Sequence, residues 1–83
     1  MNHTMNEESM IALWRSIFGR SDIEPHHNFF ELGGDSFAAL HIIAQIQRST
    51  GIRLRIDAVF SHPSSSALCT YLDSLAAATP SGD

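Results

Sequence analysis

The sequence predicts an all-α domain, built as a bundle of three longer helices and one short helix, with a long loop between the first two helices. Three observations predict this fold. Apolar residues recur at intervals of three and four along three stretches of the chain, which is the period of an amphipathic helix. Residues typical of helix ends border those stretches. The sequence shows no internal repeat and no convincing pair of strands.

The chain is expected to form one small domain. Its 83 residues and 43% hydrophobic content are ordinary for a single globular unit. We divide it into an N-terminal lead over residues 1–5, a folded domain over residues 6–75 and a tail over residues 76–83. The lead and the tail are expected to be flexible, because they are short, polar or small-residue segments at the chain ends.

The first helix is predicted to begin at Asn6 or Glu7 and to end at Phe18. Glu7 and Glu8 suit the positive end of the helix dipole, and Gly19 is typical of the residue that ends a helix. Apolar side chains recur along it at helical spacing: Met10, Leu13, Trp14, Ile17 and Phe18.

Residues 20–35 are predicted to form the long loop. Pro25 interrupts any helix there, and Gly33 and Gly34 give the backbone unusual freedom. The loop is more than a spacer, because several of its side chains are large and apolar. In so small a domain we expect them to fill part of the core: Ile23, Phe29, Phe30 and Leu32.

The second helix is predicted from about Ser36 to Thr50, with Asp35 as its N-cap and Gly51 as its end. One side of this helix follows the i, i+3, i+4, i+7 spacing of a buried stripe, formed by Ala39, Ile42, Ile43 and Ile46. We expect one core that contains Trp14, Phe30, Leu32, Ile42 and Ile46.

Two more helical segments are predicted in the last third of the chain. A short turn of helix is expected over residues 57–60. Pro63 then precedes a last helix from about Ser65 to Leu75, with Ser64 as its N-cap. The apolar side chains of this helix also recur at helical spacing: Leu68, Tyr71, Leu72 and Leu75.

The composition argues against several classes of function. The single cysteine, Cys69, cannot form an internal disulfide, and we interpret it as a small packing residue. Five Lys and Arg residues with a net charge of -4 argue against a nucleic-acid binder. The chain has no apolar run of membrane-spanning length and no signal-peptide pattern, so we expect a cytoplasmic location without membrane contact. We also expect a monomer. No metal site is expected, because the histidines lack ligand spacing: His3, His26, His27, His41 and His62.

The stretch from Asn28 to Phe37 is the most informative part of the sequence. Ser36 lies at the first turn of a predicted helix, after two glycines that let a large partner approach the backbone closely. The free N–H groups and the positive dipole end of a helix favour a nearby phosphate. A hydroxyl group at this position therefore suits the formation of a phosphodiester, although many serines near helix starts are only caps.

The residues from Phe29 to Ser36, in the order Phe-Phe-Glu-Leu-Gly-Gly-Asp-Ser, resemble the attachment motif of the peptidyl carrier proteins. These are the thiolation domains of nonribosomal peptide synthetases and are related to the acyl carrier proteins of polyketide synthases. Other segments are similar to the family as well, and the resemblance covers about residues 7–75, including the four-helix order of the carrier-protein bundle. These segments are Trp14 to Gly19, Thr50 to Leu54 and Val59 to Ser64.

The resemblance implies that Ser36 is esterified with 4'-phosphopantetheine, which a phosphopantetheinyl transferase takes from coenzyme A. Gly34 and Asp35 are the other expected cofactor-site residues. The position of Asp35 helps the transferase arrange its metal in the family, but a helix N-cap explains this residue about as well. The thiol of the arm then holds an aminoacyl, peptidyl or acyl group as a thioester, and the chain itself is not expected to be an enzyme.

The resemblance also implies partner proteins. Besides the transferase, these are an adenylation or other loading enzyme, and condensation, ketosynthase or tailoring enzymes. Phe37, Leu40 and Ala44 lie opposite the buried stripe of the second helix and are predicted to form the docking face. An alternative is that the long loop folds over Phe37. Phe37 also stands where the family commonly has leucine, which affects the choice of partner.

Three alternatives remain at this point. The first is an acyl carrier protein of a polyketide synthase, but the absence of acidic residues along the second helix after Asp35 favours a peptidyl carrier. The second is a GDS-type serine hydrolase using Ser36, but it would require a sheet, an oxyanion hole and a positioned His/Asp pair, and this chain is too short for such a sheet and offers no strand before Ser36. The third is a purely structural bundle, which leaves the motif without a purpose. Whether the carrier is free-standing or part of a megasynthase stays open.

Overall fold

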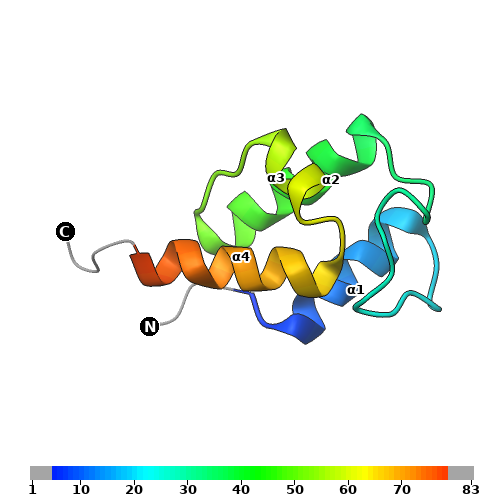
Figure 1. The fold of residues 1–83 in the computed structure, drawn as a ribbon, viewed down its shortest axis with the longest axis horizontal. Helices are drawn as coiled ribbons and strands as arrows, with labels where there is room; N and C mark the ends of the chain where they lie inside the picture. Colours follow the sequence, from blue (N-terminus) through cyan, green and yellow to red (C-terminus); the bar gives the residue numbers. More distant parts are fainter. Residues whose placement is uncertain (1–4, 79–83) are drawn as a thin grey trace.

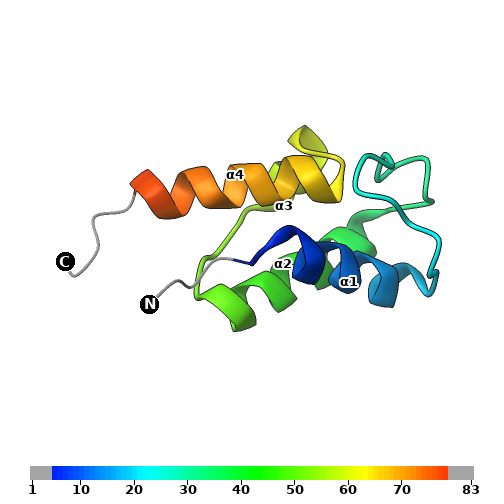
Figure 2. The ribbon, with the colours of Figure 1, turned by 90° about the horizontal axis from the view of Figure 1, so that it is seen from below.

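The computed structural model describes residues 5–78 and forms four helices within that range. They are α1 (Glu7–Phe18), α2 (Ser36–Thr50), α3 (Ile56–Ser61) and α4 (Ser65–Ala78). α1 packs against α2 and α4, and α3 packs against α2. Figure 2 shows α4 on one side of the molecule and α1 and α2 on the other. The loop between α1 and α2 wraps one end of the bundle (Figure 1). The predicted all-α fold is confirmed.

The helix ends are set by capping side chains and by glycines, most of which the sequence predicts. The side-chain oxygens of Asn6, Asp35 and Ser64 each accept a hydrogen bond from the backbone N–H three residues later, at 2.7, 3.0 and 3.0 Å. Such an N-cap typically stabilises a helix by about 1 kcal/mol. Gly19 and Gly51 end α1 and α2 in the left-handed conformation, with φ of 67° and 79°. The caps at Asp35 and Ser64 were predicted; the cap at Asn6 was not.

The structure differs from the predicted boundaries at three places. α3 is one residue longer at each end than residues 57–60. α4 continues three residues past Leu75 to Ala78, because alanine has the highest helix propensity and nothing there breaks the helix. Met5, expected in the flexible lead, is buried, and its carbonyl oxygen lies 3.4 Å from Sγ of Cys69. Residues 1–4 and 79–83, the rest of the predicted lead and tail, lie outside the described residues.

The core joins all four helices with one ring from the long loop. Trp14 and Phe29 are both fully buried, and their rings meet edge to face with centroids 5.7 Å apart. Aromatic pairs in this geometry contribute about 0.5–1.5 kcal/mol beyond the burial of their area. The other large side chains that are fully buried are Met10, Ile23, Ile42, Ile46, Val59, Leu68 and Leu72.

The predicted core is therefore correct for Trp14, Ile42 and Ile46 and wrong for Phe30. The side chain of Phe30 is 52% exposed, and Leu32 is only half-buried. The reason is local. Phe29 and Phe30 are neighbours in a turn, so they cannot both point inward, and Phe29 takes the place in the core.

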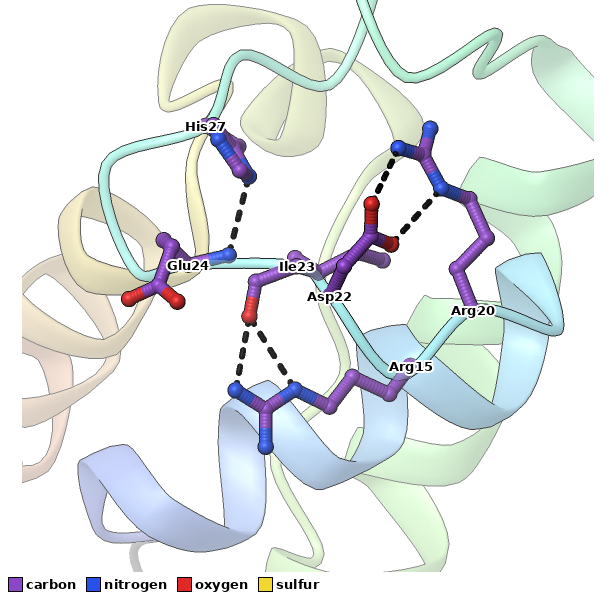
Figure 3. Close-up of polar contacts among 6 residues, drawn as sticks. All are labelled: Arg15, Arg20, Asp22, Ile23, Glu24 and His27. Carbon is purple, nitrogen blue, oxygen red and sulfur yellow. Dashed lines mark hydrogen bonds and ion pairs between the residues drawn. The ribbon is translucent and has the colours of Figure 1, made fainter.

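Arginine side chains hold the first part of the long loop. The guanidinium group of Arg15 on α1 donates two hydrogen bonds to the carbonyl oxygen of Ile23, at 3.0 and 2.7 Å. Arg20 makes a two-pronged ion pair with Asp22, its Nη2 lying 2.9 Å from Oδ2 (Figure 3). This pair raises the pKa of Arg20 and lowers that of Asp22, but it is exposed and so stabilises the loop only modestly.

The second part of the loop is tied to the segment between α3 and α4. The N–H of Ser66 donates to the carbonyl oxygen of Pro25 at 3.1 Å, and the N–H of Phe29 donates to the carbonyl oxygen of Pro63. These hydrogen bonds fix the loop to α1, to α4 and to the segment between α3 and α4, although the loop contains no helix of its own.

Gly34 closes the loop over the buried ring of Phe29. A Cβ atom added at Gly34 would lie 2.5 Å from Cε2 and Cζ of that ring. Real Cβ atoms do not approach carbon so closely, and the ring has no room to move because Trp14, Phe18 and Phe60 surround it. Gly34 does not have a positive φ, so its small size, rather than its backbone conformation, is what the fold requires.

We therefore predict that Gly34→Ala destabilises the protein. Replacing glycine by alanine at a compatible backbone position stabilises by about 0.4–1 kcal/mol through the unfolded chain. Overpacking a core costs about 1–3 kcal/mol, so the steric effect should win. Chemical denaturation of the wild type and the variant measures the difference.

The control is a double-mutant cycle with Phe29→Leu, which removes the ring atoms nearest to Gly34. In that background Gly34→Ala should cost much less than it does in the wild type. Equal costs in the two backgrounds would show that the contact does not determine the stability of the loop.

Candidate functional site

Ser36 is an exposed residue at the start of α2. The long loop delivers it there, and this point lies at the opposite end of the molecule from the last turn of α4 (Figures 1 and 2). Among residues 5–78 the structure gives the Ser36 hydroxyl no hydrogen-bond partner. A large enzyme can therefore reach the hydroxyl without disturbing the core.

The backbone around Ser36 provides hydrogen-bond donors. Oδ1 of Asp35 accepts from the N–H of Ala38 at 3.0 Å. Within the described range, no acceptor is found for the N–H groups of Ser36 and Phe37. These two donors lie at the positive end of the α2 dipole, an arrangement that suits a phosphate group. The residues present therefore fit a phosphodiester on Ser36.

The two sides of α2 differ in the way that the sequence predicts. Ala39, Ile42, Ile43 and Ile46 are buried. On the other side Phe37 is 76% exposed, Leu40 is 52% exposed, and Ala44 is also exposed. The alternative in which the long loop covers Phe37 is therefore wrong. That Phe37, Leu40 and Ala44 serve as a docking face stays a prediction.

The pair of exposed aromatic rings formed by the long loop and α3 was not predicted from the sequence. Phe30 on the loop and Phe60 on α3 stack with ring centroids 5.6 Å apart and planes 30° apart. Both rings also contact Phe29. The two neighbouring phenylalanines were the available signal, because adjacent residues outside a helix point in different directions.

The geometry argues against the hydrolase alternative. The residues before Ser36 form turns: the N–H of Gly33 donates to the carbonyl oxygen of Phe30, and the N–H of Gly34 donates to that of Phe29. A nucleophile elbow instead places its serine directly after a strand of a sheet. No strand is present in the described part of the chain.

Three of the four histidines within residues 5–78 have structural contacts, and the fourth, His41, is exposed on α2. Nδ1 of His27 accepts from the N–H of Glu24 at 2.9 Å (Figure 3), and the rings of His26 and His27 lie 4.9 Å apart. The ring of His62 stacks on that of Tyr71 at 4.2 Å. Among residues 5–78, no three His, Cys, Asp or Glu side chains gather where they could hold a metal ion.

Cys69 is a packing residue in α4. It is 2% exposed. Burial raises the pKa of its thiol, and the nearby charges of Asp73 and Glu7 add to that effect. A buried thiol that stays protonated is a poor nucleophile.

None of the helices over residues 5–78 is long and apolar enough to cross a membrane.

Comparison with known proteins identifies the family. The family model described as the phosphopantetheine attachment site matches residues 8–72. Chondramide synthase from Chondromyces crocatus is 36% identical over 76 residues, which is 92% of this chain. Tyrocidine synthase 3 from Brevibacillus parabrevis is 37% identical over 66 residues, or 80% of this chain. The chain spans only 2% and 1% of the lengths of these two relatives.

Solved carrier domains share the fold. A peptidyl carrier protein with an active-site mutation, solved in solution, has a TM-score of 0.82 and 26% identity, with 93% of this chain and 88% of that chain covered. A chain from the complex of the phosphopantetheine transferase Sfp with coenzyme A and a peptidyl carrier protein has a TM-score of 0.78 and 28% identity, with 89% and 99% covered. An A1-type acyl carrier domain from module 5 of MLSA1 has a TM-score of 0.74 and 27% identity, with 82% and 71% covered.

These relatives, the matched family model and the four-helix bundle agree. The chain therefore belongs to the phosphopantetheine-binding family of carrier domains, of the kind found in nonribosomal peptide synthetases, and its cofactor is 4'-phosphopantetheine.

Proposed function

We propose that Ser36 is the attachment residue for the 4'-phosphopantetheine arm, and that the chain holds an aminoacyl, peptidyl or acyl group as a thioester on the thiol of this arm. The observation that carries the proposal is the exposed hydroxyl of Ser36 at the start of α2, directly after Gly33, Gly34 and Asp35 and inside the matched family region.

The chemistry of attachment fits the local groups. The Ser36 oxygen would form an ester bond to the phosphorus of coenzyme A next to the pantetheine. The P–O bond from that phosphorus to the bridging oxygen of the pyrophosphate would break and release adenosine 3',5'-bisphosphate, and the hydroxyl proton would pass to a base of the transferase. The unpaired N–H groups at the start of α2 would then face the new phosphodiester and offset part of its negative charge.

Asp35 can serve both roles that the sequence suggests. Its Oδ1 caps α2. Oδ2 has no hydrogen-bond or ion-pair partner within residues 5–78, so it is available to a metal ion that the transferase brings. We propose that Asp35 holds the start of α2 in place with one oxygen and helps the transferase with the other.

We propose that the chain performs no catalysis of its own, in keeping with the generally non-catalytic character of its family. A transferase would install the arm, and an adenylating or other loading enzyme would charge it. Condensation, ketosynthase or tailoring enzymes would then use the cargo. A neighbouring structure pairs a carrier protein with the transferase Sfp, which supports the first of these partners. A cytoplasmic location stays a prediction.

We further propose that Phe37, Leu40 and Ala44 form the docking face for these enzymes. The three residues project from the exposed side of α2, from the position directly after Ser36 to about two turns further along the helix. An acyl carrier protein of a polyketide synthase is the second candidate, which the similarity to the MLSA1 carrier domain favours. The near-neutral α2, without an acidic residue after Asp35, supports the peptidyl carrier.

The attachment site can be tested with Ser36→Ala. The wild type, incubated with coenzyme A and a phosphopantetheinyl transferase, should gain the mass of one 4'-phosphopantetheine group. The variant should gain nothing, yet its stability should change by less than about 0.5 kcal/mol, because only an exposed hydroxyl is lost. Ser64→Ala is the control, since it removes another serine hydroxyl near a helix start and should leave the mass gain intact. Modification that persists in Ser36→Ala would disprove the proposed site.

The docking face can be tested with Phe37→Ala. We expect this variant to be as stable as the wild type within about 0.5 kcal/mol, because the ring is 76% exposed. Its modification by the transferase, or its loading by the adenylating enzyme, should slow by about 10-fold, which corresponds to about 1.4 kcal/mol of lost contact. Gln45→Ala, also on the exposed surface of α2, is the control and should leave both rates unchanged. Wild-type rates for Phe37→Ala with every partner would refute the docking face.

A further inference from the structure

The stacked rings of Phe30 and Phe60 form an apolar surface that the fold itself leaves uncovered. Phe30 is 52% exposed and Phe60 is 37% exposed. Exposed apolar area is unfavourable in water in proportion to its size. The two rings are not loose, because both rest on the buried ring of Phe29, with centroids 5.5 and 6.2 Å away.

The backbone holds both rings in place. The N–H of Phe30 donates to Oδ1 of Asn28 at 2.8 Å, and its carbonyl oxygen accepts from the N–H of Gly33 at 3.1 Å. Phe60 belongs to α3, whose last turn is closed by the N–H of His62 donating to the carbonyl oxygen of Ala58 at 3.0 Å. The aromatic surface is therefore formed before any ligand arrives, which lowers the entropy lost on binding.

This surface lies close to the attachment serine. Gly33, which is hydrogen-bonded to Phe30, is three residues before Ser36. Three residues span at most about 11 Å even when fully extended. An arm attached to Ser36 is long and flexible, so its end can return to the two rings. Tethering also raises the effective concentration of the bound group to the order of millimolar.

We infer that Phe30 and Phe60 form a resting surface for the cargo on the arm, and that the cargo is an aromatic or branched apolar aminoacyl group. The inference rests on the proposed attachment at Ser36. Apolar and aromatic side chains can stack on the rings, and the tethered state needs only a weak attraction. An aromatic contact of this kind changes a population by about 2- to 10-fold.

The charges near the rings favour an amino acid over a dicarboxylic extender. Glu31 follows Phe30, and Asp57 lies one turn before Phe60 on α3; both are exposed. Asp57 is partly compensated by Arg55, whose Nε lies 3.6 Å from Oδ1. An aminoacyl thioester carries an ammonium group, which acidic neighbours and an aromatic face both attract. A malonyl-type cargo carries a carboxylate, which the same neighbours repel.

The test uses the whole chain, loaded at Ser36 by a transferase with coenzyme A analogues that carry phenylalanyl, leucyl, glycyl or malonyl groups. Amide-linked analogues provide stable samples for NMR, and thioester-linked analogues provide hydrolysis rates. Mass spectrometry first confirms one loaded group per molecule. We expect phenylalanyl and leucyl groups to shift the resonances of Phe30 and Phe60 relative to the glycyl and malonyl samples. The phenylalanyl thioester should hydrolyse about 2- to 10-fold more slowly on the wild type than on Phe30→Ala or Phe60→Ala. The glycyl thioester should hydrolyse equally on all three.

The outcomes separate this inference from the proposed function. Complete loading, followed by equal resonance shifts for all cargoes and by equal phenylalanyl lifetimes on the wild type, Phe30→Ala and Phe60→Ala, would overturn the resting surface and leave the role of Ser36 intact. Absence of loading at Ser36 would overturn both. If Phe30→Ala leaves the phenylalanyl lifetime unchanged but slows a loading enzyme, the rings are a protein contact and the inference is wrong. Phe60→Ala provides a second variant on a different element, so a folding defect in one variant does not decide the result.

Discussion

The ring of Phe29 fills the space that Gly34 leaves open, and the geometry of the site depends on this contact. Phe29 is the one loop residue whose ring joins the aromatic contacts around Trp14 and Phe18. Because the loop is fastened there, Gly34 lies directly over the ring, and α2 begins two residues later. The motif around Ser36 therefore has a structural role as well as a chemical one. Gly34 allows the loop to pack on the core, because any larger residue at that position would collide with the ring of Phe29.

The contact between Phe29 and Gly34 also decides which side chains of the loop point into the core and which point toward solvent. With Phe29 in the core, Phe30 points outward and meets Phe60. On α2 the period of the helix makes the corresponding separation, with Ile42 and Ile46 inside and Phe37 outside. Stability thus rests on the inner set, while the hydroxyl of Ser36 and the exposed rings contribute little to it. A carrier that has to meet and leave several enzymes benefits from such a division, because its contact surface can be apolar without being part of its core.

The three longer helices were predictable from the sequence because each one combines a periodic apolar face with a residue that starts or ends it. Asp35 and Gly51 gave both ends of α2 correctly, because they are its N-cap and C-cap. The end of α4 was placed too early, because the alanines after Leu75 lack a periodic pattern but still favour a helix. The candidate site at Ser36 was predictable from its motif and its position at a helix start. The burial of Met5 was not, because it depends on a contact with Cys69, which is distant in sequence. The two adjacent phenylalanines indicated that one ring would point outward, but which ring enters the core depends on contacts with Trp14 and Phe18.

The central claim is that the reactive thiol of this protein is not encoded in its sequence but arrives on Ser36. The thiol of Cys69 is 2% exposed, and burial raises its pKa, so it stays protonated and shielded near pH 8. A thiol on a flexible arm is exposed to solvent and is free of the burial that raises the pKa of Cys69, so it reacts fast. The direct measurement is a time-resolved titration of native protein with a thiol reagent at pH 8. The account predicts no fast-reacting thiol before treatment with coenzyme A and a transferase, one per molecule afterwards, and none in treated Ser36→Ala. A fast-reacting thiol in the untreated protein, or a gain of one in Ser36→Ala, would contradict it.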